Sequence, residues 1–298
     1  MFKNITILDD SGNIFFARQL EHIKAKSYDV QYADLVARSL FPVSNEAPEG
    51  VDIITYRTYD MVGAARIINS YADDLPRADV FGSETIRQVR AVGTSIGYSR
   101  NEILQSQMTG LPLDQRRANA CQRAWEETVD DIAWNGAADH NLIGFLTHPN
   151  IPSLASGVVG GWIAATPDEI IADITTAFGK VRADTKMKEN PNTMLLPVLL
   201  FNHISSTPRA SNSDTTILKF VLDNVVGLNE IHPVNELLTD MFIYDKNPDK
   251  LQLEIPKELE FFPPQEVGLE LKVPAWGKTA GVNIYYPLSV LKITDVGV

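Results

Sequence analysis

The chain has 298 residues, enough to bury a sizeable core and near the length, roughly 250 to 300 residues, at which single cores divide into two. Hydrophobic residues make up 44% and charged residues 21%, as in ordinary folded proteins, and no run of about 18 apolar residues is present to cross a bilayer. The formal net charge of -12, without a lysine and arginine cluster, argues against a surface that binds nucleic acid.

The N-terminal region predicts an extended arm. The first residues, MFKNITILDDSGN, place two aspartates where a secretory signal has its apolar stretch, so we expect the chain to start in a cytoplasm. Residues 14–41 alternate polar and apolar irregularly, with a short helical pattern at 34–40. They lead into FPVSNEAPEG, whose prolines and glycine break the chain.

The basic residues are segregated along the chain. Apart from Lys3, Lys24 and Lys26, every lysine lies at or after Lys180, so residues 27–179 use arginine as their only basic residue besides histidine. Because guanidinium groups form bidentate ion pairs, this usage suits partly buried interfaces. A compositional bias of the lineage explains it equally well, and both interpretations stay open.

Residues 51–70, VDIITYRTYDMVGAARIINS, predict a hairpin of two strands joined around Asp60–Gly63. A lone two-stranded hairpin is marginally stable in water, and nothing upstream is suited to cover it. We therefore expect a partner surface, such as another subunit, to do so.

The central third predicts a strand at 86–98, followed by two helices. Ser99 and Glu102 form a capping box that starts a short helix. Asp114 caps a second helix over 114–135, in which Arg123 is placed to pair with Glu127. Its apolar positions recur every three or four residues, at Ala118, Cys121, Trp125, Val129 and Ile132. Gly136 ends this helix, which at 1.5 Å per residue is roughly 33 Å long.

The C-terminal half predicts further helices and strands. Thr166, Pro167 and Glu169 start a helix whose apolar stripe is Ile170, Ile174, Ala177 and Val181. MLLPVLLFNHI (194–204) predicts a buried strand and SDTTILKFVLDNV (213–225) a short helix. The period-two alternation of residues 267–276 and 281–293 predicts half-buried strands.

Several patterns imitate catalytic sites. Gly93, Ser95 and Gly97 spell the G-x-S-x-G elbow of serine hydrolases, but the capping box starts the helix four residues too late for an elbow. The histidines lack the spacing of a helical metal pair, no nucleotide-binding fingerprint is present, and the one cysteine excludes an intrachain disulfide. We predict no catalytic residue, cofactor or resident metal.

Charged residues around the hairpin are the best candidates for a functional surface. Asp73 and Asp74, close to Pro76, could bind a cation or pair with an arginine of a neighbouring subunit, and we favour the ion pair. The candidate subunit-interface residues are Arg57, Arg66, Asp73, Asp74, Arg77 and Asp79.

The motifs YADDLPRADVFG (71–82), GYSRNEI (97–103), LDQRRANACQRAWEETVDDIAWNG (113–136) and NLIGFLTHPNIP (141–152) resemble those of the encapsulin-like family of tailed-phage major capsid proteins. Those proteins share the Hong Kong 97 type shell fold. The resemblance is specific in the central third and rests on element types after residue 166.

The resemblance implies an α+β fold with a defined division of the chain. It predicts an N-terminal arm at 1–48, an extended hairpin called the E-loop at 49–85, and an axial domain at 193–233. The peripheral domain takes 86–192 and 234–298, with a spine helix at 114–135 and the final strands returning to its sheet. Some relatives crosslink a lysine to an asparagine between subunits, but this E-loop contains no lysine.

The function that the resemblance implies is a structural one, without enzymatic activity. Copies of the chain would form pentamers and hexamers in the icosahedral head of a tailed phage or prophage, assembled in the host cytoplasm. The shell would enclose DNA without sequence-specific binding, with scaffold, portal and decoration proteins as further partners and no membrane. Two alternatives remain, an encapsulin-type nanocompartment shell and a serine hydrolase that uses Ser95.

Overall fold

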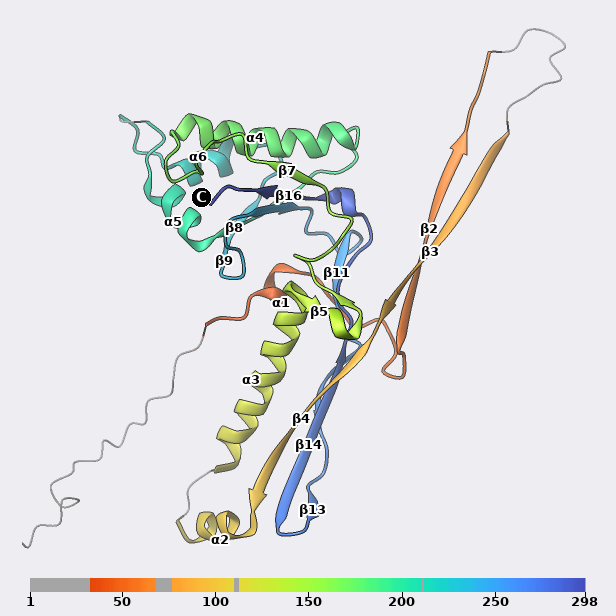
Figure 1. The fold of residues 1–298 in the computed structure, drawn as a ribbon, viewed down its shortest axis with the longest axis vertical. Coiled ribbons are helices and arrows are strands. Elements are labelled where there is room, and N and C mark those ends of the chain that lie inside the picture. The colour runs from red at the N-terminus through yellow and green to blue at the C-terminus, as the bar shows by residue number, and fades with distance from the viewer. Residues whose placement is uncertain (1–32, 68–76, 110–112, 211, 298) are drawn as a thin grey trace, which may run out of the picture. The chain divides into compact units, whose positions relative to one another are not determined.

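The structure is a computed structural model that describes residues 33–67, 77–109, 113–210 and 212–297. The chain divides into two units, 1–34 and 35–298, and all elements named below lie in the second. Helices and strands are both abundant, which confirms the expected α+β class (Figure 1).

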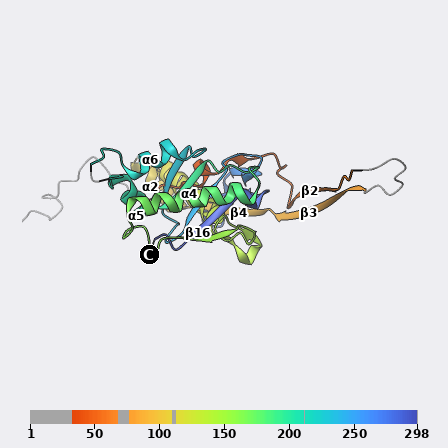
Figure 2. The same ribbon diagram turned by 90° about the horizontal axis from the view of Figure 1, so that it is seen from above.

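The predicted hairpin exists but is longer than expected. Strand β2 (Ile53–Gly63) pairs antiparallel with β3 (Ala78–Gln88) along its whole length, and the two extend beyond the other strands in both ribbon views (Figure 1, Figure 2). The prediction of a turn at Asp60–Gly63 is therefore wrong. Gly63 is the last residue of β2, where a Cβ would lie only 3.0 Å from the Cβ of Ala78, so this glycine permits close strand approach.

The predicted strand at 86–98 is divided between two sheets. Its first residues end β3, and the rest form β4 (Arg90–Ser99), which pairs with β14 (Glu270–Thr279) over its full length. The residue between them, Val89, is buried and donates its backbone N–H to the carbonyl of Asp52 at 2.9 Å. Hydrogen bonding to two different partners breaks the strand, which periodicity cannot reveal.

The sheet around β14 packs against the helix predicted at 114–135. Strands β12 (Lys257–Phe261) and β13 (Gln265–Val267) pair with β14 on the edge opposite β4. Helix α2 (Arg100–Thr109) follows β4, and Glu102 accepts the Ser99 backbone N–H at 3.1 Å as the capping box predicts.

The helix predicted at 114–135 is α3 (Leu113–Trp134), which starts one residue before the expected cap, Asp114. Cys121, Trp125, Val129 and Ile132 are buried as predicted, and Arg123 pairs with Glu127 at 2.7 Å. Gly136 follows with φ of +74°, a left-handed conformation in which a side chain would also collide with backbone atoms of residues 142 and 144. The chain then passes through β5 (Gly136–Ala137), the 3-10 turn η2 (Ala138–His140) and β6 (Leu142–Ile143).

A five-stranded sheet forms the second body of the fold. Its order is β7-β16-β10-β8-β9, with parallel outer pairs and antiparallel inner pairs. The strands are β7 (Ser153–Ala155), β8 (Thr193–Pro197), β9 (Glu230–Val234), β10 (Met241–Tyr244) and β16 (Val290–Thr294). We expected the final strands to return to the sheet beside the predicted spine helix. β14 pairs with β4 in that sheet, whereas β16 lies between β7 and β10 in the five-stranded sheet.

Three helices and the sheet share one hydrophobic core. They are α4 (Pro167–Asp184), α5 (Val198–Ser206) and α6 (Ile217–Asn224). Helix α4 has the predicted capping box, and its predicted apolar stripe is buried. The prediction of one strand over 194–204 is wrong after Pro197, where α5 begins. Leu200 and Ile204, one helical turn apart, are both buried there.

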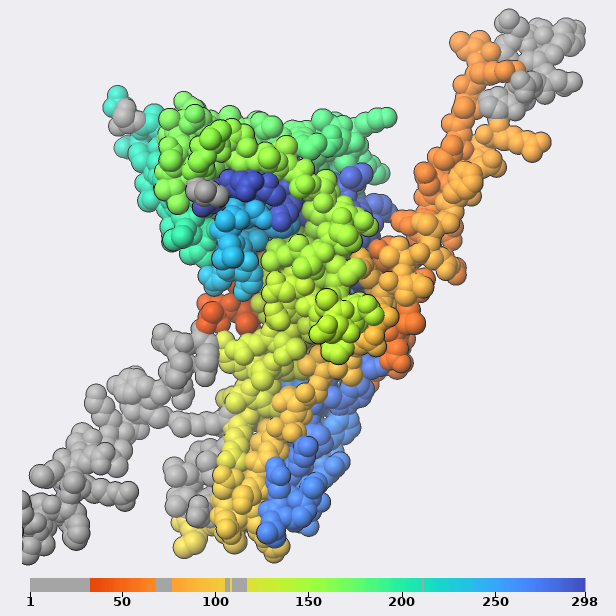
Figure 3. Space-filling model, in the orientation of Figure 1, coloured from red at the N-terminus to blue at the C-terminus, as the bar shows by residue number. Residues whose placement is uncertain are grey.

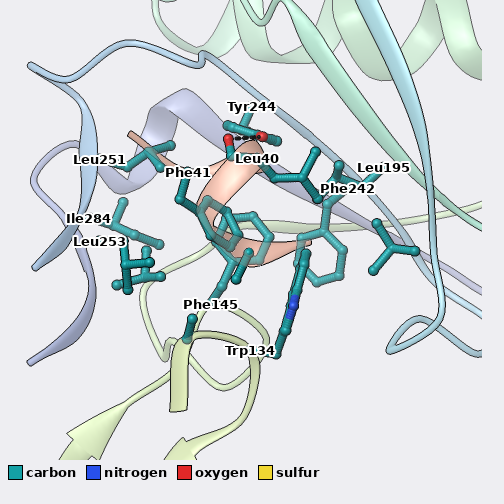
Figure 4. Close-up of a cluster of buried hydrophobic side chains, with 14 of the residues drawn as sticks. Leu40, Phe41, Trp134, Phe145, Leu195, Phe242, Tyr244, Leu251, Leu253 and Ile284 are labelled. Atoms are coloured by element: carbon teal, nitrogen blue, oxygen red, sulfur yellow. Dashed lines mark hydrogen bonds between the residues drawn. The ribbon is translucent and has the colours of Figure 1, made fainter. Parts of the chain in front are cut away.

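The other face of the sheet packs on residues that were expected to belong to the arm. Helix α1 (Ala37–Leu40) starts at the backbone N–H of Ala37, which donates to Asp130 of α3 at 2.9 Å. Phe41 lies among Trp134, Phe145 and Tyr244, with ring centroids 4.9 to 6.0 Å apart (Figure 4). The Tyr244 hydroxyl donates to the Leu40 carbonyl at 2.8 Å.

A small three-stranded sheet completes this core. Strand β1 (Val43–Ser44) runs parallel to β11 (Leu251–Glu254), which pairs antiparallel with β15 (Gly281–Ile284). The 3-10 turn η3 (Pro287–Ser289) interrupts the strand predicted at 281–293 between β15 and β16. Ala37, Leu40 and Phe41 are thus buried among residues that lie mostly more than 80 positions later in the chain.

Candidate subunit-interface surfaces

One face of the β2–β3 hairpin is apolar and exposed. Directly paired residues place their side chains on the same face of a two-stranded sheet, and every second pair shares a face. One such face, which we call the apolar face, carries Ile53, Tyr59, Met61, Val80 and Ile86, all of them exposed. Figure 3 shows the outer part of the hairpin standing clear of the other described elements. Exposed apolar side chains gathered on one face are typical of a protein contact.

The opposite face, which we call the polar face, carries Thr58, Asp60, Asp79 and Ser83 together with Val62 and Phe81. The Thr58 and Ser83 hydroxyls lie 3.0 Å apart across the strands. At the base of the hairpin the same face contacts the body. The Tyr56 ring meets Tyr285 edge-on at 5.0 Å, and Arg87 meets His148 at 2.9 Å. The apolar face therefore points away from the part of its own chain that holds the hairpin.

The structure separates the candidate interface residues. Arg57 pairs with Glu84 at 2.8 Å within the apolar face, and Asp79 lies on the polar face opposite Val62. Arg66 and Arg77 are exposed just beyond the ends of β2 and β3. Asp73 and Asp74 lie outside the described residues. Sequence reasoning missed the exposed apolar residues because it placed the turn inside β2. Residues 53–62 do not alternate between apolar and polar, so no local pattern marks the apolar face.

A loop beside α4 has a fixed shape and an apolar tip. The carboxylate of Asp173, only 6% exposed, accepts three hydrogen bonds: from Ser156 Oγ at 2.7 Å, Gly157 N at 2.9 Å and Trp162 Nε1 at 2.9 Å. Val159, between these anchors, is 99% exposed. A buried carboxylate thus holds the loop in one conformation with its valine in solvent.

A second exposed apolar region lies where α2 meets the β13–β14 turn. A groove there is lined by Ile103, Leu104, Leu269 and Leu271, with the charged Arg100, Glu266 and Glu270 beside them. Met108 and Val267 are also exposed. The guanidinium of Arg117 on α3 lies 2.9 Å from the carboxylate of Glu102 on α2 and so holds the two helices together. This ion pair lowers the pKa of the Glu102 carboxyl.

The residues singled out for catalysis are not arranged as a catalytic site. Ser95 lies in the middle of β4, opposite Pro274, four residues before the strand ends, so it is not at a strand-to-helix turn. Among the described residues no group of histidine, cysteine, aspartate and glutamate side chains could hold a metal ion. A search of the described helices for one long and apolar enough to span a membrane found none.

Comparison with known proteins identifies a protein family over most of the chain. The family model described as "Major capsid protein" matches residues 63–296. The capsid of Myoviridae phage XM1 is similar in structure, with a TM-score of 0.83 at 17% identity over 95% of this chain and 99% of that chain. No curated protein sequence matches the chain.

Two further solved structures are similar at lower scores. The capsid of a native GTA particle has a TM-score of 0.65 at 9% identity and covers 98% of both chains. A chain of Mycobacterium phage Ogopogo has a TM-score of 0.63 at 13% identity over 95% of this chain and 100% of that one. At these identities the structures show the fold, which is the Hong Kong 97 type, while the family model covers well over half of the sequence. The chain therefore belongs to the major capsid protein family.

Proposed function

We propose that copies of this chain associate, in rings of five and six, into the icosahedral head of a tailed phage or prophage that encloses DNA. The observation that carries the proposal is the family match over residues 63–296. The exposed apolar face of the hairpin supports it, because a structural subunit needs surfaces that only other copies cover.

The apolar face of the hairpin is the proposed docking surface on a neighbouring copy. Met61 and Val80 are cross-strand partners and are 81% and 63% exposed, so most of both side chains is available for burial. Arg57 and Glu84 neutralise each other in the middle of this face, so docking would not bury an unpaired charge. The polar face carries Asp60 and Asp79 and is less suited to burial.

The expected division of the chain is kept as a proposal, with one adjustment. The arm takes 1–48, the E-loop 49–85, the axial domain 193–233, and the peripheral domain 86–192 and 234–298 with its spine helix. Because β10 pairs with β8, β16 pairs with β10, and α4 packs in the same core, we move these three elements from the peripheral to the axial domain. Residues 37–44 act as an anchor that fixes the arm to the body.

The proposed location is the virion, after assembly in the host cytoplasm. Scaffold, portal and decoration proteins are proposed as further partners. The net charge of -12 is consistent with enclosing DNA without adhering to it, because few clustered cations are available to neutralise phosphates. The candidate residues Arg57, Arg66, Asp73, Asp74, Arg77 and Asp79 remain proposed interface residues.

Electron microscopy of the purified full-length chain tests the proposal. Negatively stained protein should show closed shells of uniform diameter. A chain that stays monomeric at high concentration would contradict it. Shell size and contents separate a phage head from a nanocompartment, and an ester-hydrolysis assay of the Ser95→Ala variant tests the enzymatic alternative.

A further inference from the structure

The hairpin is fixed to the body by a small set of contacts at its base. The ammonium of Lys278 donates to the Val51 carbonyl at 3.2 Å and to the Asp52 carboxylate at 3.0 Å. On the polar face, the Tyr56 ring contacts the Tyr285 ring, and the Arg87 guanidinium contacts the His148 ring. Together with the buried Val89, which joins β3 to β4, these contacts hold the angle at which the hairpin leaves the body.

His148 is unusual among them because both of its ring nitrogens face hydrogen-bond donors. Nη2 of Arg87 lies 2.9 Å from Nε2, and the backbone N–H of Asn150 points at Nδ1 from 3.3 Å. A neutral imidazole has one nitrogen that accepts a hydrogen bond, and an imidazolium has none. His148 is only 7% exposed, so little solvent is available to replace either contact. The closer contact, with Arg87, requires the tautomer whose Nε2 is unprotonated.

Protonation of His148 would therefore break the contact in two ways. The imidazolium would aim an N–H at the guanidinium, so two donors would oppose each other, and two positive charges would lie within hydrogen-bond distance. Among the described residues, Arg87 is the charged side chain that lowers the pKa of the ring, and the contact at Nδ1 is made by the uncharged backbone N–H of Asn150. The nearby charges at the hairpin base, Asp52 and Lys278, are paired with each other.

We propose that His148 is an acid-sensitive latch, which as a neutral ring accepts a hydrogen bond from Arg87 and fixes the hairpin, and which as an imidazolium releases it. Burial, with the charge of Arg87, lowers the pKa of His148 to about 4, so the latch stays closed near neutral pH and opens in acid. The latch itself is a property of one subunit; its consequence, an acid-dependent direction of the docking hairpin, rests on the proposed function.

Spin labels on the hairpin and the body test the latch directly. Ser83→Cys on β3 and Asp139→Cys on η2 replace exposed residues, and native Cys121 is buried. Pulsed dipolar spectroscopy on dissociated full-length subunits then reports the distance distribution. We expect one narrow distribution near pH 7.5 and a broad one near pH 3.5, where roughly three quarters of the rings are protonated for the pKa of about 4.

Two variants distinguish opening of the latch from a general effect of acid on the subunit. His148→Gln offers an acceptor to Arg87 that cannot be protonated, so its distribution should stay narrow in acid. Arg87→Met removes the donor and should broaden the distribution near pH 7.5, which is decisive even if acid unfolds the whole subunit. The latch is refuted if wild type and His148→Gln respond identically to acid, or if Arg87→Met stays narrow. Failure of the chain to form shells, by contrast, would contradict the proposed function and leave these distances unaffected.

Discussion

Replacing Val80 with threonine, and comparing it with the same change at Val62, tests the docking face of the hairpin. Both valines are exposed, 63% and 52%, and they lie one position apart in the strand register, so their side chains point to opposite faces. Threonine is nearly isosteric with valine and is also β-branched, so both variants should keep the hairpin. The pair thus differs in the face that is altered and in little else.

The size of the effect follows from what each side chain would bury. A valine side chain contributes about 1.5 to 3 kcal/mol when fully buried, and about two thirds of Val80 is free to be buried by another copy. Threonine loses a methyl group and buries a hydroxyl in its place, at a cost of about 1 to 2 kcal/mol per contact. Since 1.4 kcal/mol is a factor of ten in an equilibrium constant, the critical concentration should rise about 5-fold to 30-fold for Val80→Thr.

The assay is the assembled fraction as a function of total protein, measured by sedimentation and checked by electron microscopy. Val62→Thr should shift the critical concentration by less than about twofold, because a polar face that stays in solvent gains nothing from valine. Equal shifts in the two variants would show that the face does not matter. A normal critical concentration for Val80→Thr would show that this face does not dock at all.

Three further predictions concern the stability of the subunit, measured as the midpoint of urea unfolding under dissociating conditions. Asp173→Ala leaves three donors, including the indole of Trp162, without their acceptor and should lower the free energy of unfolding by about 2 to 4 kcal/mol. The control Asp168→Ala, at an exposed position of the same helix, should lower it by less than about 1 kcal/mol. Equal losses would contradict the role given to the buried carboxylate. Phe41→Ala removes a ring packed against three others and should cost about 3 to 5 kcal/mol, so a loss below about 1 would mean that the arm segment is not part of the core. The pKa of His148 is lowered to about 4 in the folded chain, below the ordinary 6.5, so its contribution to the free energy of unfolding is complete above pH 6.5 and falls by about 3 kcal/mol as the pH drops to 4. His148→Gln should remove this dependence of stability on pH. An unchanged dependence would assign it to other groups.

Local sequence patterns determined the two long helices of this protein, α3 and α4. The spacing of Cys121, Trp125 and Val129 predicted the buried side of α3, and Thr166 with Glu169 predicted the start of α4 to the residue. These signals are readable because hydrogen bonds and side-chain neighbours in a helix lie within four residues of each other. The motifs of residues 71–152 indicated the capsid family and its fold in the same way, as short stretches of sequence.

Partner strands were beyond the reach of such patterns. Residues 86–98 alternate as one strand, yet Val89 divides them because β3 pairs with β2 and β4 pairs with a strand nearly 180 positions later. The turn expected at Asp60 was wrong for the same reason, since the pairing of β2 with β3 continues to Gly63. Pro197 likewise ends β8 and begins α5 where the apolar run continues.

The surfaces that we assign to function are products of tertiary structure. Sequence reasoning favoured charged residues near the hairpin as the interface. The fold shows instead a row of exposed apolar side chains that includes Met61 and Val80, and this row can be recognised only once the strand register is known. The contact between Arg87 and His148 joins residues 61 positions apart, and no sequence pattern indicates it. The sequence by itself determined the two long helices and the family to which the chain belongs, because those depend on near neighbours, whereas α5 lay in a segment predicted as a strand. Which face of the hairpin is free, and what fixes its base, depended on contacts between distant segments, and only the folded chain decides those.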